Sequence, residues 1–280
     1  MPADKLILLS RNVASKFACA VETKGHPKGK YSRYLDLRKT AYALPVRLYC
    51  GGSFNNTNKV EFVQVATLGL SRVEQIVEEI CGNLPEPIIC RVDWAVDLLG
   101  MGFWDLVACC RVAGIQNSRL YHSRGGDSFY PHCSRDRALL MYEKLRRLRL
   151  EGDPLAEIFR KDDQMTRLEV QFRGKGVPIR EFAHIRRYGD IDLLKGVSFL
   201  ELRQLRSTLK PQQRLAAERL QSMVQEVGLQ NASKRFSPSE WVYLCDTYFE
   251  PASKAALPDI RALMQKSARD WLEDRIRFPR

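Results

Sequence analysis

Polar and apolar residues alternate along three stretches in the middle of the chain, 88–97, 138–144 and 165–173. This period of two predicts strands, in which successive side chains point to opposite faces of a sheet. Position parity assigns the following residues to one polar face: Arg91, Asp93, Asp97, Tyr142, Lys144, Arg167, Glu169, Gln171 and Arg173. The opposite face of the first stretch is expected to hold Ile88, Cys90, Val92, Trp94 and Val96. If the three strands are neighbours, the polar residues form a seam, which we call the polar seam.

Other patterns before residue 177 also favour strands. Residues 31–37, 46–50, 60–65 and 119–123 have strand-like alternation, and glycine and asparagine residues between the second and third predict a hairpin turn. Two helices are expected, at 71–80 and 103–112. Ser71 followed by Glu74 has the spacing of a capping box that would begin the first helix.

The pattern changes near residue 178, after which helical periodicity replaces alternation. Helices are predicted at 198–209, 211–228, 239–249 and 258–276. The chain is therefore divided into a strand-rich catalytic part, 1–177, and a helical part, 178–280, for DNA recognition or dimer contact. The expected fold class is α+β, with an antiparallel sheet core and a helical C-terminal part.

The positive net charge of the chain indicates which kind of molecule it binds. The chain has 45 Lys and Arg residues against 33 Asp and Glu, a formal net charge of +12. Such an excess is typical of proteins that bind polyanions, nucleic acid first and an anionic membrane surface second. No apolar run is long enough to span a membrane. The eight cysteines form no C-x-x-C pair, which favours reduced thiols and a cytoplasmic location over disulfides or a zinc site.

The polar seam has the residue types for one chemistry in particular. A tyrosine phenolate can attack a DNA phosphodiester and form a covalent intermediate. Mg²⁺ or Mn²⁺, which prefer oxygen ligands, could be held by Asp93, Asp97 and Glu169. Lys144 could stabilise the developing charge, and Arg91 and Arg167 could hold phosphates. The basic run Arg146, Arg147 and Arg149 could follow the DNA backbone, or could be an ordinary solvated face.

The order of these residues resembles a known family. Arg91-Val92-Asp93-Trp94-Ala95-Val96-Asp97, Tyr121-His122-Ser123, Tyr142-Glu143-Lys144 and Arg167-Leu168-Glu169 are similar, in order and spacing, to motifs of rolling-circle replication initiators. These are plasmid initiators and filamentous-phage gene II-type proteins of the HUH endonuclease superfamily. The resemblance implies a Rep-like nuclease fold and metal-dependent nicking and closing of one strand at a replication origin. It also implies Tyr142 as the nucleophile that stays attached to the 5′ phosphate.

Several alternatives remain open at this stage. Tyr121 and Tyr130 are rival nucleophiles, and His122 or His132 could bind metal. The acids could instead be salt-bridge partners of the arginines. The protein could be a non-catalytic repressor or architectural factor, or a relaxase or transposase with the same chemistry. A host helicase, a polymerase and a second copy of the chain are further expected partners that the sequence leaves undecided.

Overall fold

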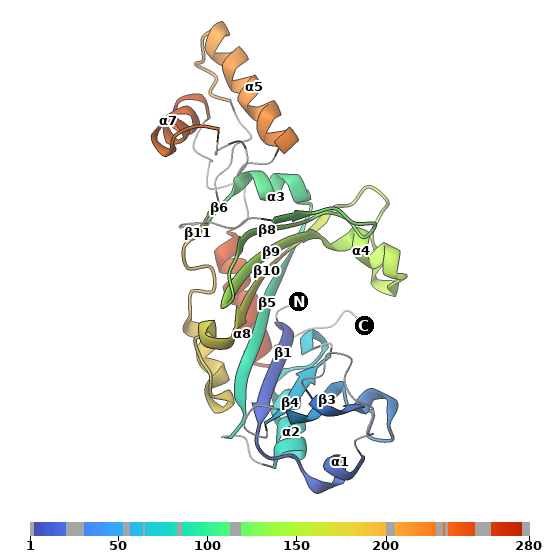
Figure 1. The fold of residues 1–280 in the computed structure, drawn as a ribbon. Coiled ribbons are helices and arrows are strands. Elements are labelled where there is room, and N and C mark those ends of the chain that lie inside the picture. The colour runs from blue at the N-terminus through green and yellow to red at the C-terminus, as the bar shows by residue number, and fades with distance from the viewer. Residues whose placement is uncertain are drawn as a thin grey trace.

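Nine strands form one antiparallel sheet, which organises most of the chain (Figure 1). The computed structural model describes residues 3–20, 31–52, 57–63, 65–82, 86–112, 119–199, 205–227, 232, 235–249 and 259–275. The strand order is β2-β3-β4-β1-β5-β10-β9-β8-β7. The bounds are β1 Ala3–Ser10, β2 Tyr31–Asp36, β3 Val46–Gly52, β4 Asn58–Phe62, β5 Ile88–Leu99, β7 Arg119–Tyr121, β8 Ser128–Cys133, β9 Arg137–Glu143 and β10 Met165–Arg173. The predicted α+β class with an antiparallel sheet is confirmed.

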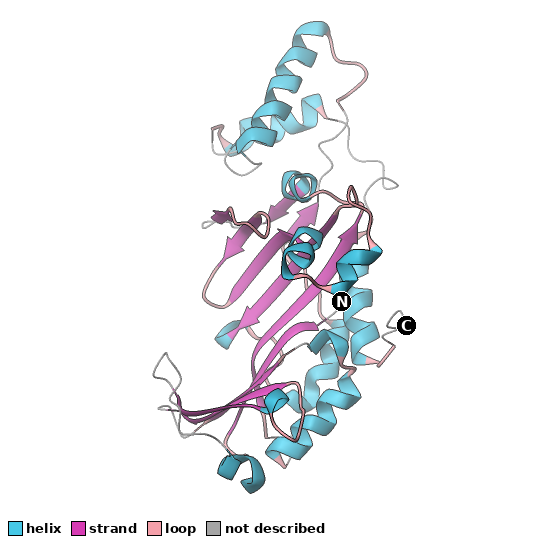
Figure 2. Ribbon diagram, turned by 90° about the vertical axis from the view of Figure 1, so that its right-hand side faces the viewer, coloured by secondary structure: helices cyan, strands magenta, loops and turns pink. Residues whose placement is uncertain are grey.

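One face of this sheet is apolar and is covered by helices. The helices concerned are α2 (Leu70–Cys81), α3 (Phe103–Cys109), the 3-10 helix η5 (Phe182–Asp190) and α8 (Ile260–Leu272). Their apolar side chains join those of the strands in one hydrophobic cluster. At its centre the Trp94 ring contacts the rings of Tyr188 and Trp271. Figure 2 shows the sheet with its twist, β2–β4 lying at a steep angle to the strands above them.

The opposite face of the sheet carries the polar residues. In β5 the side chains alternate between the two faces as predicted from Val92 to the end of the strand. Two register shifts alter the pattern nearer the strand ends, between Ala3 and Lys5 and between Ile7 and Leu8. The second leaves Cys90 as an extra residue in β5, so Ile89 is fully buried while Ile88 is exposed. The predicted positions of Ile88 and Cys90 on the apolar face are therefore wrong, because a β-bulge reverses the alternation.

Several predicted bounds also differ from the structure. Lys144 begins helix α4 (Lys144–Glu151) and does not end the strand. The N-cap of helix α2 is Gly69, so Ser71 lies inside the helix and does not cap it. The backbone N–H of Ser71 donates to the carboxylate of Asp274. The helix expected at 103–112 ends at Cys109 and is followed by β6 (Cys110–Val112), which pairs with β11 (Val197–Phe199). That short strand replaces the start of the helix expected at 198–209.

The C-terminal helices divide between two hydrophobic clusters. Helix α8 packs on the main sheet with α2 and η5. Helices α5 (Pro211–Val227) and α7 (Pro238–Tyr248) share a separate small cluster with residues such as Leu220 and Cys245. The boundary predicted at 177 stays a prediction, but the packing ties α8 and η5 to the sheet. None of the described helices is both long and apolar enough to cross a membrane.

The remaining short elements join the strands at the sheet ends. They are α1 (Ser15–Ala20) and the 3-10 helices η1 (Leu37–Lys39), η2 (Val65–Thr67), η3 (Pro154–Ile158) and η4 (Gly174–Gly176). Helix α4 and η3 share a third hydrophobic cluster, formed by Leu145, Leu148 and Ala156 with Met165. Met165 has the parity of Arg167, so this cluster closes one end of the polar face.

Candidate functional site

The polar seam is assembled by the pairing of β10 with β5 and β9. In the β5 pairing Arg167 is opposite Asp97, and Gln171 is opposite Asp93. In the β9 pairing the same Arg167 is opposite Tyr142. Directly paired residues of neighbouring strands point to the same face. The structure therefore brings Asp93, Asp97, Glu169 and Tyr142 to one face of one sheet.

Two arginines engage the aspartates of the seam. The Nε atom of Arg91 donates to both carboxylate oxygens of Asp93, at 2.9 and 3.0 Å. Arg167, which is 1% exposed, donates from Nε and Nη2 to Asp97, at 2.6 and 2.8 Å. Burial by itself raises the pKa of Asp97, but the charge of Arg167 outweighs it, so this pKa is lower than usual. Both oxygens of Asp97 are thus bonded to a guanidinium.

Arg167 has a second acidic partner that the sequence analysis missed. Its Nη1 atom donates to Asp4 Oδ1. Asp4 is the extra residue of the first bulge in β1, because Ala3 pairs with Trp94 and Lys5 with Asp93. A β-bulge changes the direction in which side chains point. The bulge at Asp4 directs its carboxylate to the polar face, where it meets Arg167. In the sequence, Asp4 lies just before Lys5 and the short apolar run Leu6 to Leu9, and no motif there indicated this role.

Glu169 lies among these acids without a cation bonded to it in the described hydrogen bonds. It is 4% exposed and accepts a hydrogen bond from Gln171 Nε2 at 2.5 Å. Burial, and then the negative charges of Asp4 and Asp93, raise the pKa of Glu169 to about 7. Burial also raises the pKa of Asp93, despite its bonds to Arg91. A buried carboxyl group that repels its neighbours is typical of a functional site.

The donor chemistry of this cluster suits a hard cation. Asp4, Asp93 and Glu169 offer carboxylate oxygens, the ligands that Mg²⁺ and Mn²⁺ prefer, and a cation would relieve their mutual repulsion. Among the residues that the structure describes, no three such side chains converge closely enough to form a ready-made metal centre. By residue type and charge Asp4, Asp93 and Glu169 fit a hard cation, and the predicted ligand Asp97 has both carboxylate oxygens bonded to Arg167.

Tyr142 is enclosed. It is 5% exposed, and the guanidinium of Arg147 from α4 lies over its ring, 4.7 Å from the centroid. Burial raises the pKa of the Tyr142 phenol well above its usual value, and Arg167 offsets only part of this. Burial also lowers the pKa of Lys144 at the start of α4. Arg146 pairs with Glu143 at 3.3 Å, and Arg149 bonds the backbone carbonyl of Lys161.

The rival tyrosines lie on the β7–β8 hairpin at the sheet edge. Tyr121 pairs with Ser128, and Ser128 pairs with Tyr142, so Tyr121 shares the polar face. Its ring meets the Tyr130 ring edge to face, with 5.7 Å between centroids. Tyr121 is 49% exposed, whereas Tyr130 is partly buried and near enough to Glu169 to have its pKa raised, after burial, by that charge.

The hairpin loop is fixed by local contacts. Gly126 has φ +101°, and a Cβ there would lie 2.5 Å from a Glu143 carboxylate oxygen, so only glycine fits without a shift. Nδ1 of the exposed His122 lies within hydrogen-bond distance of Asp127 Oδ1, at 2.9 Å. His132 is partly buried, and its pKa is lowered first by burial and then by Arg137. Neither histidine joins a described metal-binding group.

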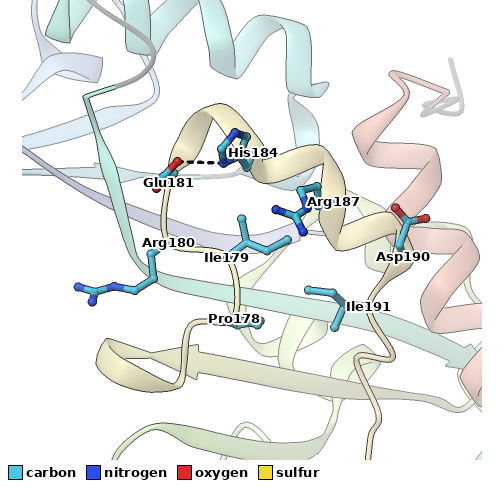
Figure 3. Close-up of a pocket in the computed structure, with 8 residues that line it drawn as sticks. All are labelled: Pro178, Ile179, Arg180, Glu181, His184, Arg187, Asp190 and Ile191. Atoms are coloured by element: carbon cyan, nitrogen blue, oxygen red, sulfur yellow. Dashed lines mark ion pairs between the residues drawn. The ribbon is translucent and has the colours of Figure 1, made fainter.

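A separate pocket lies on the helix-covered side of the sheet (Figure 3). It has a volume of about 500 Å³ and is lined by the chain from Pro178 to Ile191. Its ionisable residues include Arg180, Arg187 and His184, and Nδ1 of His184 is 2.9 Å from Glu181. Because η5 packs on the apolar face through Tyr188, this pocket does not open onto the polar seam.

Comparisons with known proteins give no relative for this chain. No known protein family matches the sequence, and no curated protein resembles it significantly. The site must therefore be interpreted from its own residues.

Proposed function

We propose that this protein nicks and closes one strand of DNA at a specific site, through a covalent phosphotyrosine, as in the initiation of rolling-circle replication. The observation that carries the proposal is the coexistence of buried acids, arginines and three tyrosines on one face of the sheet, in a protein of net charge +12. A protein that only binds DNA gains nothing from repelling carboxyl groups such as Glu169 beside its phosphate ligands. The order of the motifs supports the same conclusion.

Each part of the polar seam has a role in this proposal. Asp4, Asp93 and Glu169 would hold Mg²⁺ or Mn²⁺, which when bound supplies positive charge against the scissile phosphate. Arg91 and Arg173, paired across β5 and β10, provide cations where the strand would enter the acidic cluster. Arg167 keeps Asp4 and Asp97 in place. The tyrosine oxygen forms a bond to phosphorus as the bond from phosphorus to the 3′ oxygen breaks. The phenol gives up one proton, and the 3′ oxygen takes up one and leaves as a hydroxyl.

Two observations favour different tyrosines as the nucleophile. The resemblance to initiators implies Tyr142, but a phosphodiester must reach the phenol oxygen, and Tyr142 is 5% exposed beneath Arg147. Tyr121 is 49% exposed on the same face, and Arg119 lies two residues before it on the same strand, β7. We therefore propose Tyr121 as the attacking residue and a positioning role for Tyr142.

The first experiment is a tyrosine scan for covalent attachment. The full chain is incubated with single-stranded fragments from a library of candidate origins and Mn²⁺, and adducts are resolved by denaturing electrophoresis and mass spectrometry. We expect an adduct in the wild type that disappears completely in Tyr121→Phe and persists in Tyr130→Phe. An adduct that survives in Tyr121→Phe and is lost in Tyr142→Phe would transfer the role to Tyr142.

The same assay separates the enzyme from a binding protein. Tyr243 lies exposed on α7, outside the polar seam. Tyr243→Phe is therefore a matched control that should form the adduct normally. If sequence-specific binding occurs but no variant or wild-type protein ever forms an adduct with any metal, the protein is a non-catalytic DNA-binding factor.

A further inference from the structure

A second group of aromatic and basic side chains lies on the polar face, away from the seam. It belongs to β2, β3 and β4 and comprises Tyr31, Tyr34, Tyr49, Arg47 and Lys59, which we call the tyrosine flank. The Tyr49 ring contacts the rings of Tyr31 and Tyr34, with centroids 5.6 and 5.0 Å apart. Lys59 Nζ lies 3.9 Å from the Tyr49 ring centroid. Tyr31 and Tyr34 remain partly exposed above the buried Tyr49.

The sheet register connects this flank to the seam. Arg47 is opposite Glu61, and Glu61 is opposite Ile7. Ile7 is in turn opposite Arg91, and Arg91 is opposite Arg173. These partners form an uninterrupted row across the polar face, from β3 to β10. With strands about 4.8 Å apart, the row is roughly 19 Å long, a distance that a few nucleotides of single strand can cover.

The charge of the flank suits an anionic strand. Glu61 is bonded by both Lys5 and Lys59, at 2.9 and 2.8 Å. Asp36 is paired in the same way with Arg38 and Arg47, at 2.6 and 3.5 Å. Each cluster therefore has two cations for one carboxylate and keeps a net positive charge. Partly exposed tyrosine rings beside such cations have the composition of a surface that stacks bases and attracts their phosphates.

We propose that the tyrosine flank binds the single-stranded DNA next to the cleaved phosphodiester, stacking bases on Tyr31 and Tyr34. This inference rests on the proposed function, because it identifies the strand as the substrate of the seam. Arg47 and Lys59 contact its phosphates. Duplex DNA is excluded from this mode because its bases are already stacked and paired, so their faces are not available to the rings.

The test is equilibrium binding of the full chain to short, fluorescently labelled single strands, followed by anisotropy in EDTA so that cleavage plays no part. Tyr34→Ala should weaken binding about 5- to 10-fold, at the lower end of what a lost base–aromatic stack costs. Tyr34→Phe keeps the ring and should bind within about 2-fold of wild type. Arg47→Gln should reduce the slope of log affinity against log salt by about 0.7, the value for one phosphate contact on a single strand.

Controls separate this inference from the proposed nicking activity. Tyr243→Ala removes a more exposed tyrosine from α7 and should not change the affinity. Circular dichroism melting establishes that each variant is folded. Unchanged affinity in a folded Tyr34→Ala protein, or tighter binding of duplex than of single strand, overturns the inference even if the covalent adduct forms. Loss of the adduct with normal single-strand binding overturns the nicking proposal alone.

Discussion

Glu61 and Glu169 lie on the same face of the same sheet, yet the pKa values of their carboxyl groups are shifted in opposite directions. Burial raises the pKa of Glu61, but hydrogen bonds from Lys59 and Lys5 outweigh it and lower the value to about 2. Burial and the charges of Asp4 and Asp93 raise the pKa of Glu169 to about 7. Glu61 has two cations, Lys59 of the flank and Lys5 of β1, whereas in the seam Arg167 serves two acids, Asp4 and Asp97.

This contrast indicates what each region is built for. Compensated charges on the flank stabilise the fold and leave positive charge for a ligand. Repelling acids in the seam cost folding free energy, and proteins retain such clusters where function requires them. Substitutions in the two regions should therefore change the free energy of unfolding by different amounts.

The largest effect is expected for Arg167→Met. The substitution keeps most of the side-chain volume but leaves Asp4 and Asp97 without their shared guanidinium. Removing one partner of a buried ion pair costs about 3–5 kcal/mol, and we expect a loss of that size in the free energy of unfolding by urea. Arg146→Met, on the exposed face of α4, should change it by less than about 0.5 kcal/mol. Equal costs for the two variants would mean that Arg167 is not essential to the seam.

An intermediate effect of opposite sign is expected for Glu169→Gln. The folded state holds a proton on Glu169 up to a pKa of about 7, above the usual value of 4.5, so the wild type loses stability as the pH rises from about 4.5 to about 7. The amide does not ionise. Without metal at pH 8 it should be more stable than wild type by roughly 1–3 kcal/mol, and the gain should shrink as the pH is lowered to 5.

Two controls accompany this pH series. Glu61→Gln should lose stability at neutral pH, because a pKa lowered to about 2 stabilises the fold above about pH 4.5 and that contribution declines as the pH falls toward 2. Mn²⁺ should raise the melting temperature of wild type more than that of Glu169→Gln, which lacks one proposed ligand. A melting temperature that Mn²⁺ leaves unchanged in both proteins would contradict metal binding at the seam.

The smallest effect is expected for Lys5→Met. Glu61 keeps its bond to Lys59, so the charge remains compensated, and the loss in unfolding free energy should stay below about 1 kcal/mol. The measurement is the same urea titration, compared directly with Arg167→Met. A cost for Lys5→Met as large as that for Arg167→Met would remove the distinction between the flank and the seam.

Local alternation predicted the central strands and, from Val92 onward, the faces on which their side chains lie. Alternation in residues 88–97 and 165–173 is strong because one face packs against helices and the other carries charges, and this predicted the shared face of Asp93 and Glu169. Helices α5, α7 and α8 followed from their helical period, and α5 begins at Pro211. These features depend on patterns within single segments of the chain, which can be read directly from the sequence.

Which acids and tyrosines come into contact depends on how the strands and helices pair and pack. The two bulges move Asp4 onto the polar face and Cys90 off its predicted side, and a register shift depends on the neighbouring strand as well as on local alternation. The burial of Tyr142 arises from α4 folding back over the strand, and the exposure of Tyr121 from its place on the edge strand β7. These features depend on how neighbouring elements pack and pair, so periodicity within one segment could not predict them.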